Sequence, residues 1–258
     1  MKLSEISFVC WKWQTKQIPR LFLADHVNVL QAMVARWYPR PFRFICITDD
    51  RAGLNPAIEA MPMPVRFDHL KSPQGARFPQ CYARLWNFSR DAAAVLGERI
   101  FQVDIDVIIT GDLTPLVERH VDHDFVGWSD ERFQRNKIAG GAYLLRTGSM
   151  AQVWEDFDPK RSPAQAFNAG FLGSDQGWMS YKMLQVEAKA KVESGPQPQP
   201  KPSFGTWSNC DGLLKINWTE AHARHVPKGA RMIFTSGVKP PWNGEVQRRY
   251  PWIKEYWK

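Results

Sequence analysis

Residues 99–116 read RIFQVDIDVIITGDLTPL, and this stretch decides the fold because it joins a strong strand signal to two carboxylates. Successive side chains of a β-strand alternate between two faces, so Asp104 and Asp106 share one face with Gln102, and the intervening apolar residues share the other. Two carboxylates this close repel each other and lose hydration unless a positive charge lies between them. The pattern therefore predicts a D-x-D motif at which Asp104 and Asp106 hold a divalent metal.

The exit from this strand carries a turn signal. Gly111, Asp112 and Pro115 bring the chain out at the carboxyl end of the strand. In an open α/β sheet, ligands bind at that edge. The residues alone leave one alternative open, in which the strand ends near Asp104 and both acids are solvated loop residues.

The composition is that of a globular protein with enough chain to bury a core. Of the 258 residues, 44% are hydrophobic and 23% are charged, which are ordinary values for one large domain. No uncharged apolar run approaches the ~18 residues of a membrane-spanning helix, and the N-terminal residues lack a secretory pattern, so we expect a cytoplasmic protein. The four cysteines show no C-x-x-C spacing, which predicts reduced thiols.

The charge balance limits the class of partner. The net charge of +8 favours an anionic partner, such as nucleic acid, a lipid surface or a phosphorylated substrate. Most of the 12 tryptophans are expected in the core, although indole rings also stack on sugars and bases.

Strands and helices alternate along the chain, which predicts a three-layer α/β/α fold with a mainly parallel central sheet. The predicted strands are 5–11, 42–48, 65–67, the D-x-D strand, 124–128, 141–145 and 232–234. The predicted helices are 19–38, 80–96, 150–157, and one that begins near Ser174 or Asp175 and continues to Met183. Residues 195–202, GPQPQPKP, are expected to form an extended surface loop.

Three separated segments resemble GT-A-type glycosyltransferases, and within that fold the bacterial glycosyltransferase family 8 and its uncharacterised relatives. Residues 81–85, CYARL, followed by the D-x-D stretch, are similar to the family's Y-x-R-L helix and D-x-D strand. Asp175-Gln176 is similar to its D-Q pair. Residues 237–242, GVKPPW, resemble its terminal G-x-x-K-P-W. The segments occur in the family's order and span most of the chain.

The resemblance implies a single domain over residues 1–258, with a nucleotide-binding half at about 1–115 and an acceptor half at about 116–258. It implies transfer of a sugar from a nucleotide diphosphate sugar, expected to be a UDP sugar, to a glycan or lipid-linked acceptor. Mn²⁺ or Mg²⁺ is the expected cofactor, because a hard cation held by carboxylates stabilises the departing diphosphate. We expect no nucleic-acid partner, and a peripheral contact with an anionic membrane at its inner face is a further expectation.

The resemblance also assigns roles to single residues. Asp175 and Gln176 are the catalytic candidates, nearest the reacting sugar, and Asp104 and Asp106 are the metal candidates. The substrate and nucleotide candidates are Trp11, Lys12, Asp49, Asp50, Arg84, Asp104, Gly237 and Lys239.

Most of these residues have a plainer explanation, which the sequence leaves open. The plainer roles are a helix N-cap for Asp175, a solvent-directed arginine for Arg84, a surface lysine for Lys239, core packing for Trp11 and Trp13, and a solvated turn for Asp49 and Asp50.

The sequence departs from the family pattern in two places. The histidine that completes the family's metal site is replaced, with Phe234, Thr235 or Ser236 at the matching positions. The family's N-A-G before the strand that follows the metal site is Ala139-Gly140-Gly141 here, which removes an amide side chain. His222 and His225 are nearby in sequence, and a helix-surface role is expected for both.

Two other function classes remain alternatives. One is a catalytically impaired protein that binds a nucleotide sugar or a nucleic acid, because the motif histidine is missing and the chain is basic. The other is a phosphohydrolase of the haloacid dehalogenase type, because an apolar strand with D-x-D also opens that family's site.

Overall fold

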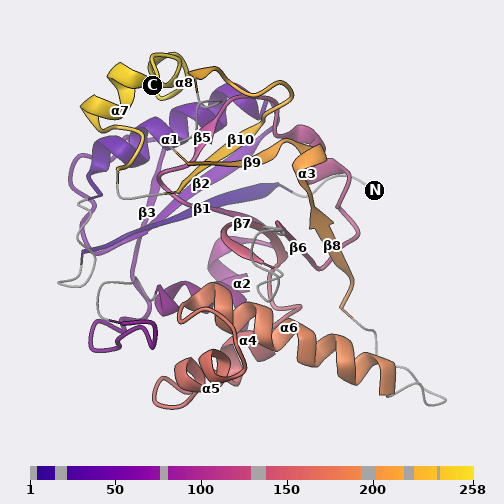
Figure 1. Cartoon of the computed structure of the whole chain (residues 1–258). Coiled ribbons are helices and arrows are strands. Elements are labelled where there is room, and N and C mark those ends of the chain that lie inside the picture. Colours follow the sequence, from indigo (N-terminus) through magenta and orange to yellow (C-terminus); the bar gives the residue numbers. More distant parts are fainter. Residues whose placement is uncertain are drawn as a thin grey trace.

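The computed structural model describes residues 5–14, 22–75, 81–128, 138–192, 202–217, 224–236 and 239–258. Its centre is a seven-stranded sheet of order β3-β2-β1-β4-β7-β6-β8 (Figure 1). The strands are β1 (Ile6–Lys12), β2 (Phe42–Thr48), β3 (Glu59–Pro62), β4 (Arg99–Val103), β6 (Phe125–Trp128), β7 (Ala139–Arg146) and β8 (Phe204–Trp207).

The first four strands of this order are mutually parallel, and β7 runs antiparallel to β4 and β6. Strand β8 is parallel to β6. The sheet is therefore mainly parallel, as the alternation of strands and helices predicts.

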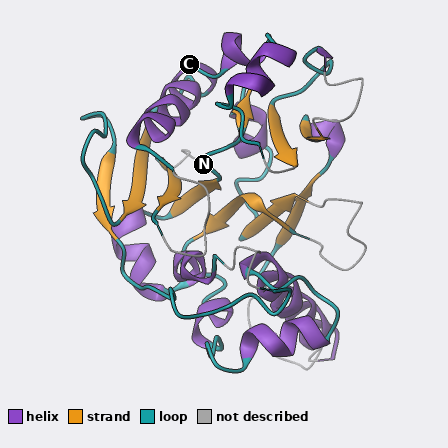
Figure 2. Ribbon diagram, turned by 60° about the vertical axis from the view of Figure 1, so that its left-hand side comes forward, coloured by secondary structure: helices purple, strands orange, loops and turns teal. Residues whose placement is uncertain are grey.

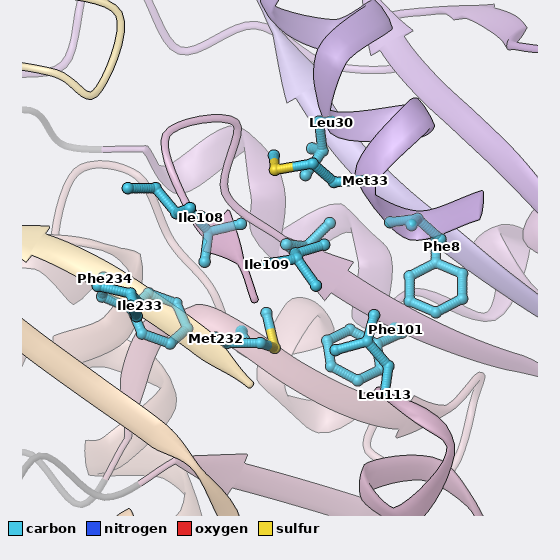
Figure 3. Packing of buried hydrophobic residues seen from close by; sticks show 14 of the residues in the cluster. Phe8, Leu30, Met33, Phe101, Ile108, Ile109, Leu113, Met232, Ile233 and Phe234 are labelled. Carbon is cyan, nitrogen blue, oxygen red and sulfur yellow. The ribbon is translucent and has the colours of Figure 1, made fainter. Parts of the chain in front are cut away.

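A smaller sheet lies beside the first, in the order β5-β10-β9. It consists of β5 (Ile108–Ile109), β9 (Leu213–Asn217) and β10 (Met232–Ser236). Figure 3 shows Ile109 between Met33 of helix α1 (Ala24–Trp37) and Met232 of β10. Burial of this apolar patch anchors the segment that follows the D-x-D motif.

Helices cover both faces of the large sheet (Figures 1 and 2). One face carries the small sheet with α1 (Ala24–Trp37), α7 (Gly244–Arg249) and α8 (Ile253–Tyr256). The other carries the 3₁₀ helix η1 (Tyr82–Phe88) with α2 (Arg90–Leu96), α4 (Gln152–Glu155), α5 (Ser162–Asn168) and α6 (Asp175–Val192). Helices α3 (Thr114–Glu118) and η2 (Asn209–Asp211) complete the elements. The three predicted layers are confirmed.

Strand β1 shows why the sheet lies at the centre. All seven of its residues are buried, and they alternate between the two cores, with Phe8 and Cys10 in one and Val9 and Trp11 in the other. A strand that is buried on both faces is typical of a parallel sheet between two helical layers.

Several predicted elements need correction. The strand expected at 65–67 is wrong, because the strand that pairs with β2 is β3, at Glu59–Pro62. The helix expected at 150–157 is shortened to α4. Residues 19–21, 80 and 195–201 of other predicted elements lie outside the described residues.

The helix expected over 80–96 is divided in two. Ser89 has extended backbone angles of φ −66° and ψ 157°, and its hydroxyl accepts a hydrogen bond from the amide of Ala92. It therefore ends η1 and caps the first turn of α2.

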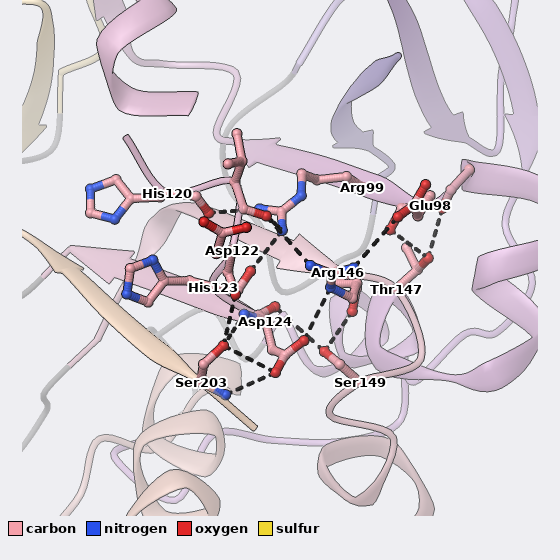
Figure 4. Close-up of polar contacts among 12 residues, drawn as sticks. Glu98, Arg99, His120, Asp122, His123, Asp124, Arg146, Thr147, Ser149 and Ser203 are labelled. Atoms are coloured by element: carbon pink, nitrogen blue, oxygen red, sulfur yellow. Dashed lines mark hydrogen bonds and ion pairs between the residues drawn. The ribbon is translucent and has the colours of Figure 1, made fainter. Parts of the chain in front are cut away.

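A polar network closes the far edge of the large sheet (Figure 4). The Arg99 guanidinium donates hydrogen bonds to the carbonyls of His120, Val121 and His123, at 3.0, 2.5 and 2.8 Å. The Asp124 carboxylate accepts a 2.8 Å hydrogen bond from the amide of Ser203, just before β8. These bonds join β4, the segment after α3 and the approach to β8.

None of the helices in the described residues is long and apolar enough to cross a membrane.

Candidate functional site

Arg84 joins the two motifs that the sequence places far apart. Its Nε and Nη2 each lie 2.7 Å from Oδ2 of Asp175, and its Nη1 is ion-paired with Oδ1 of Asp104. Arg84 comes from η1, Asp104 follows the last residue of β4, and Asp175 is the first residue of α6. Three of the predicted site residues therefore meet at one point.

This cluster is mostly buried, and burial decides its electrostatics. The side chain of Arg84 is 12% exposed and that of Asp175 is 3% exposed. Burial raises the pKa of the Asp175 carboxyl, and Arg84 opposes that shift. Burial alone would lower the pKa of Arg84, but Asp104 and Asp175 outweigh it and raise that pKa. Arg84 is therefore a fixed positive charge.

Gln176 is held against the start of β7. Its Oε1 accepts a 3.0 Å hydrogen bond from the amide of Gly140. A Cβ added at Gly140 would lie 3.1 Å from Cβ of Gln176 and 3.3 Å from Nη2 of Arg84. A side chain at this position would therefore require Gln176 or Arg84 to shift by a few tenths of an ångström.

Gly141 brings Phe234 and Asp104 together. The amide of Asp104 donates a 2.8 Å hydrogen bond to the carbonyl of Gly141. A Cβ at Gly141 would lie 2.9 Å from the ring of Phe234 and 3.4 Å from Oδ2 of Asp104. Phe234 also stacks on Trp128, with ring centroids 4.5 Å apart. Phe234 is thus an aromatic residue near the first motif carboxylate, and no sequence motif predicts its stacking on Trp128.

The D-x-D motif itself lies in a turn. Strand β4 ends at Val103, so the expected continuation of the strand through Asp106 is wrong. Ile105 and Val107 are nevertheless buried, while Asp104 and Asp106 are partly exposed. The alternative in which the strand ends near Asp104 is correct about that boundary. Asp104 is, however, ion-paired with Arg84 rather than only solvated.

The metal prediction fits this motif only in part. Carboxylate oxygens suit Mg²⁺ or Mn²⁺, but no three His, Cys, Asp or Glu side chains gather around a common point in the described part of the chain. Magnesium is commonly bound by one or two carboxylates together with substrate phosphates. Asp104 and Asp106 have the ligand type for such a shared cation, and the metal stays a prediction.

Lys12 and Trp11 lie on opposite faces of β1. Trp11 is 5% exposed, and its indole donates a 3.1 Å hydrogen bond to Oδ1 of Asn87. This environment fits the plainer role of core packing, beside Trp13, and a contact with the nucleotide stays a prediction. Lys12, the last residue of β1, is 4% exposed.

Asn87 is hydrogen-bonded to residues of the strands that carry the site, and no sequence motif predicts this role. Its Nδ2 donates hydrogen bonds to Oε1 of Gln102 at 2.8 Å and to the hydroxyl of Tyr143 at 2.9 Å. With Trp11 it forms a buried polar network that joins η1 to β1, β4 and β7, and so fixes the helix that carries Arg84.

Asp49 and Asp50 lie in the turn after β2. Asp49 accepts a 3.2 Å hydrogen bond from the amide of Gln14 and is ion-paired at 3.1 Å with Arg66. Asp50 is exposed and accepts a hydrogen bond from the amide of Ala52. Asp49 thus joins the segment after β1 to the segment after β3, and Asp50 matches the solvated turn.

Lys239 is the remaining candidate that the structure describes. It is exposed and ion-paired with Glu245 in the first turn of α7. Gly237 and His222 lie outside the described residues, and His225 is exposed. Trp242 stacks on His26 of α1, with centroids 3.8 Å apart.

The four cysteines are free thiols, as predicted.

No protein-family model and no curated protein sequence matches this chain. Among solved structures, the galactosyltransferase LgtC, in complex with donor and acceptor sugar analogues, matches 97% of this chain and 96% of its own, with 13% identity and a TM-score of 0.51. The glycosyltransferase GlyE of Streptococcus pneumoniae TIGR4 matches 98% of this chain and 61% of its own, with 10% identity and a TM-score of 0.55. The bifunctional glycosyltransferase WbbM matches 98% of this chain and 51% of its own, with 12% identity and a TM-score of 0.54. The chain therefore has the fold of the GT-A glycosyltransferases.

Proposed function

We propose that the protein transfers a sugar from a nucleoside diphosphate sugar, with a UDP sugar as the expected donor, to a glycan or lipid-linked acceptor. One observation carries the proposal: Arg84, Asp104 and Asp175, from three separate motifs, form one ion-paired cluster in a GT-A fold, in which Arg84 and Asp175 are buried and Asp104 is partly exposed. The cluster lies at the carboxyl end of β4, the edge at which α/β sheets bind ligands.

The chemistry of sugar transfer suits this cluster. When the bond to the sugar breaks, negative charge grows on the departing diphosphate, so fixed positive charge nearby lowers the barrier. Arg84 provides such a charge. Asp104 and Asp106 would hold a divalent cation, which neutralises the diphosphate when it is bound.

Asp175 and Gln176 are proposed to orient the donor sugar. Asp175 fixes the guanidinium of Arg84, and Gln176 keeps its amide nitrogen available while its oxygen accepts the bond from Gly140. The relative LgtC was solved with donor and acceptor sugar analogues, which supports both partner classes here.

The test is thermal stabilisation by ligands that bind only the folded protein. With UDP and Mn²⁺ together, we expect a larger rise in melting temperature than the sum of the rises from each alone, because the cation is shared with the diphosphate. Uridine with Mn²⁺ is the control that lacks phosphate. Equal shifts with UDP and uridine would count against a diphosphate site.

Binding without turnover is the second candidate, and Phe234 favours it. An aromatic ring stands beside Asp104 where a third metal ligand would strengthen the site. In that case UDP and Mn²⁺ would stabilise the protein jointly, but a panel of UDP sugars would release no UDP.

The phosphohydrolase alternative rests on the D-x-D strand alone and gains no support from the GT-A fold. A cytoplasmic location and a membrane contact stay predictions.

A further inference from the structure

Lys12 has no counter-charge among the described residues. The residue is 4% exposed, and the described residues provide no hydrogen-bond or ion-pair partner for its Nζ. Its Nζ is not among the fully buried side-chain atoms of the described residues that lack a hydrogen-bond partner, so the aliphatic stem is buried while the ammonium group reaches solvent. An unpaired ammonium group at this position is available to a ligand.

The position of Lys12 puts this charge beside the D-x-D turn. Strand β1 pairs in parallel with β4, with Val9 opposite Gln102. Lys12 is three residues beyond Val9, and the motif begins two residues beyond Gln102, so both are at the same edge of the sheet. The buried thiol of Cys10 supports this placement: burial and Cys46 raise its pKa, and the charges of both Asp104 and Lys12 reach it.

The charges at this edge of the sheet indicate which kind of ligand Lys12 could bind. Asp104, Asp106 and Asp175 are acidic, and Arg84 is already ion-paired with two of them. A diphosphate entering this site meets carboxylates and needs further positive charge. An ammonium group offers three donors and binds phosphate oxygens as a point charge.

We propose that Lys12 is a direct ligand of the donor diphosphate and allows the site to bind a nucleoside diphosphate without a divalent cation. The inference rests on the proposed function, because it assumes that the ligand is a nucleoside diphosphate. It adds an unpaired cation to a motif at which Arg84 is already ion-paired with two carboxylates.

The experiment measures UDP affinity by calorimetry, once in EDTA and once in Mn²⁺. The variants are Lys12→Met, which removes the charge at similar length, and the control Lys160→Met, which removes an exposed charge in the turn before α5. Wild type is expected to bind UDP in EDTA. In EDTA, Lys12→Met should weaken UDP binding about tenfold or more, which is the scale of one charge-assisted hydrogen bond. In Mn²⁺, the same variant should weaken UDP binding less. Lys160→Met should match wild type.

Uridine and melting temperature provide two independent readouts. Lys12→Met should leave uridine affinity unchanged, because uridine has no phosphate. The variant should also keep the melting temperature of wild type, because the methionine stem can replace the buried stem of Lys12 and no ion pair with a described residue is lost. A lower melting temperature or failure to fold would show a structural role for Lys12 and overturn the inference.

The remaining outcomes separate the inference from the proposed function. UDP binding that requires Mn²⁺, or that is the same in Lys12→Met and wild type, overturns the role of Lys12 and leaves the transferase proposal standing. An equal loss of uridine and UDP affinity places Lys12 at the nucleoside and also overturns it. Absence of UDP binding in both buffers overturns the proposed function itself.

Discussion

The guanidinium of Arg84 is expected to carry both stability and activity. Arg84→Met leaves the buried Asp175 without its counter-charge, which should cost about 3 kcal/mol of unfolding free energy. The same change should lower donor turnover about a hundredfold, because it removes a charge near the departing diphosphate. Urea unfolding and UDP release from a UDP sugar measure the two effects.

A double variant separates these effects. Arg84→Met with Asp175→Asn removes both charges, so most of the lost stability should return while turnover stays low. Arg90→Met is the matched control, because Arg90 is ion-paired with Glu155 at an exposed site and should change stability by less than about 1 kcal/mol. Recovery of turnover in the double variant would contradict a charge role for Arg84.

Phe234 offers a direct test of the metal prediction. A Cβ on Gly141 would touch both its ring and Oδ2 of Asp104, so Phe234→His should place an imidazole near the first motif carboxylate. Without nucleotide, Mn²⁺ affinity should rise on the order of tenfold or more, because a third ligand is added. Mn²⁺ titration followed by paramagnetic resonance measures the change. Phe234→Leu should show no rise, and an equal rise in both variants would disprove the placement.

The sequence predicts the members of the site better than their partners. Asp104, Arg84 and Asp175 were predicted from motifs, because each lies in a short pattern with fixed spacing. Their mutual ion pairs were not, since Arg84 and Asp175 are 91 positions apart and only the fold brings them together. Asn87 and Phe234 carry no motif, because one lies inside a helix pattern and the other replaces the expected residue type.

At the scale of single elements, Ser89 is the residue that positions Arg84. It separates η1 from α2 and caps α2 through the amide of Ala92. Ser89→Ala should cost about 1 kcal/mol of unfolding free energy, because the amide loses its partner. Ser89→Thr keeps the hydroxyl and serves as the control. Equal urea midpoints for the alanine variant and wild type would contradict a capping role.

The D-x-D stretch shows why element boundaries were mispredicted. Its apolar residues continue the alternation through Ile109, so the pattern predicts one long strand. In the structure the chain leaves β4 at Val103, turns, and pairs antiparallel with β10 in a second sheet through only two residues. Buried residues still alternate through the turn because residues of both sheets pack in one core. Alternation in the sequence therefore cannot distinguish one long strand from two short strands in separate sheets.

At the scale of the whole molecule, the layers follow from the sequence but the far edge of the sheet does not. Strands such as β1 and β2 are mostly apolar runs separated by a helix, which is the usual signal of a parallel sheet. Strand β8 has four residues, of which only Trp207 is fully buried, and its partner β6 lies some 80 positions earlier. A short strand with a distant partner gives little local signal.

This far edge contains a pair of imidazoles that should make the stability of the whole protein depend on pH. His120 and His123 lie with ring centroids 5.2 Å apart, and their Nδ1 atoms are buried without a partner among the described residues. Gly205 of β8 packs against both rings. Burial lowers the pKa of His120, and the neighbouring His123, Arg119 and Arg99 lower it further, while Asp211 opposes them.

The sign of the pH effect follows from proton uptake. Below the ordinary histidine pKa of about 6.5, the unfolded chain binds a proton that folded His120 resists, so stability falls as the pH is lowered through that range and is constant above it. We expect a lower urea midpoint at pH 5.5 than at pH 7.5. His120→Phe should reduce that difference, because the ring no longer titrates, whereas His225→Phe, at an exposed position, should not. If both variants keep the wild-type difference, the pH dependence arises elsewhere.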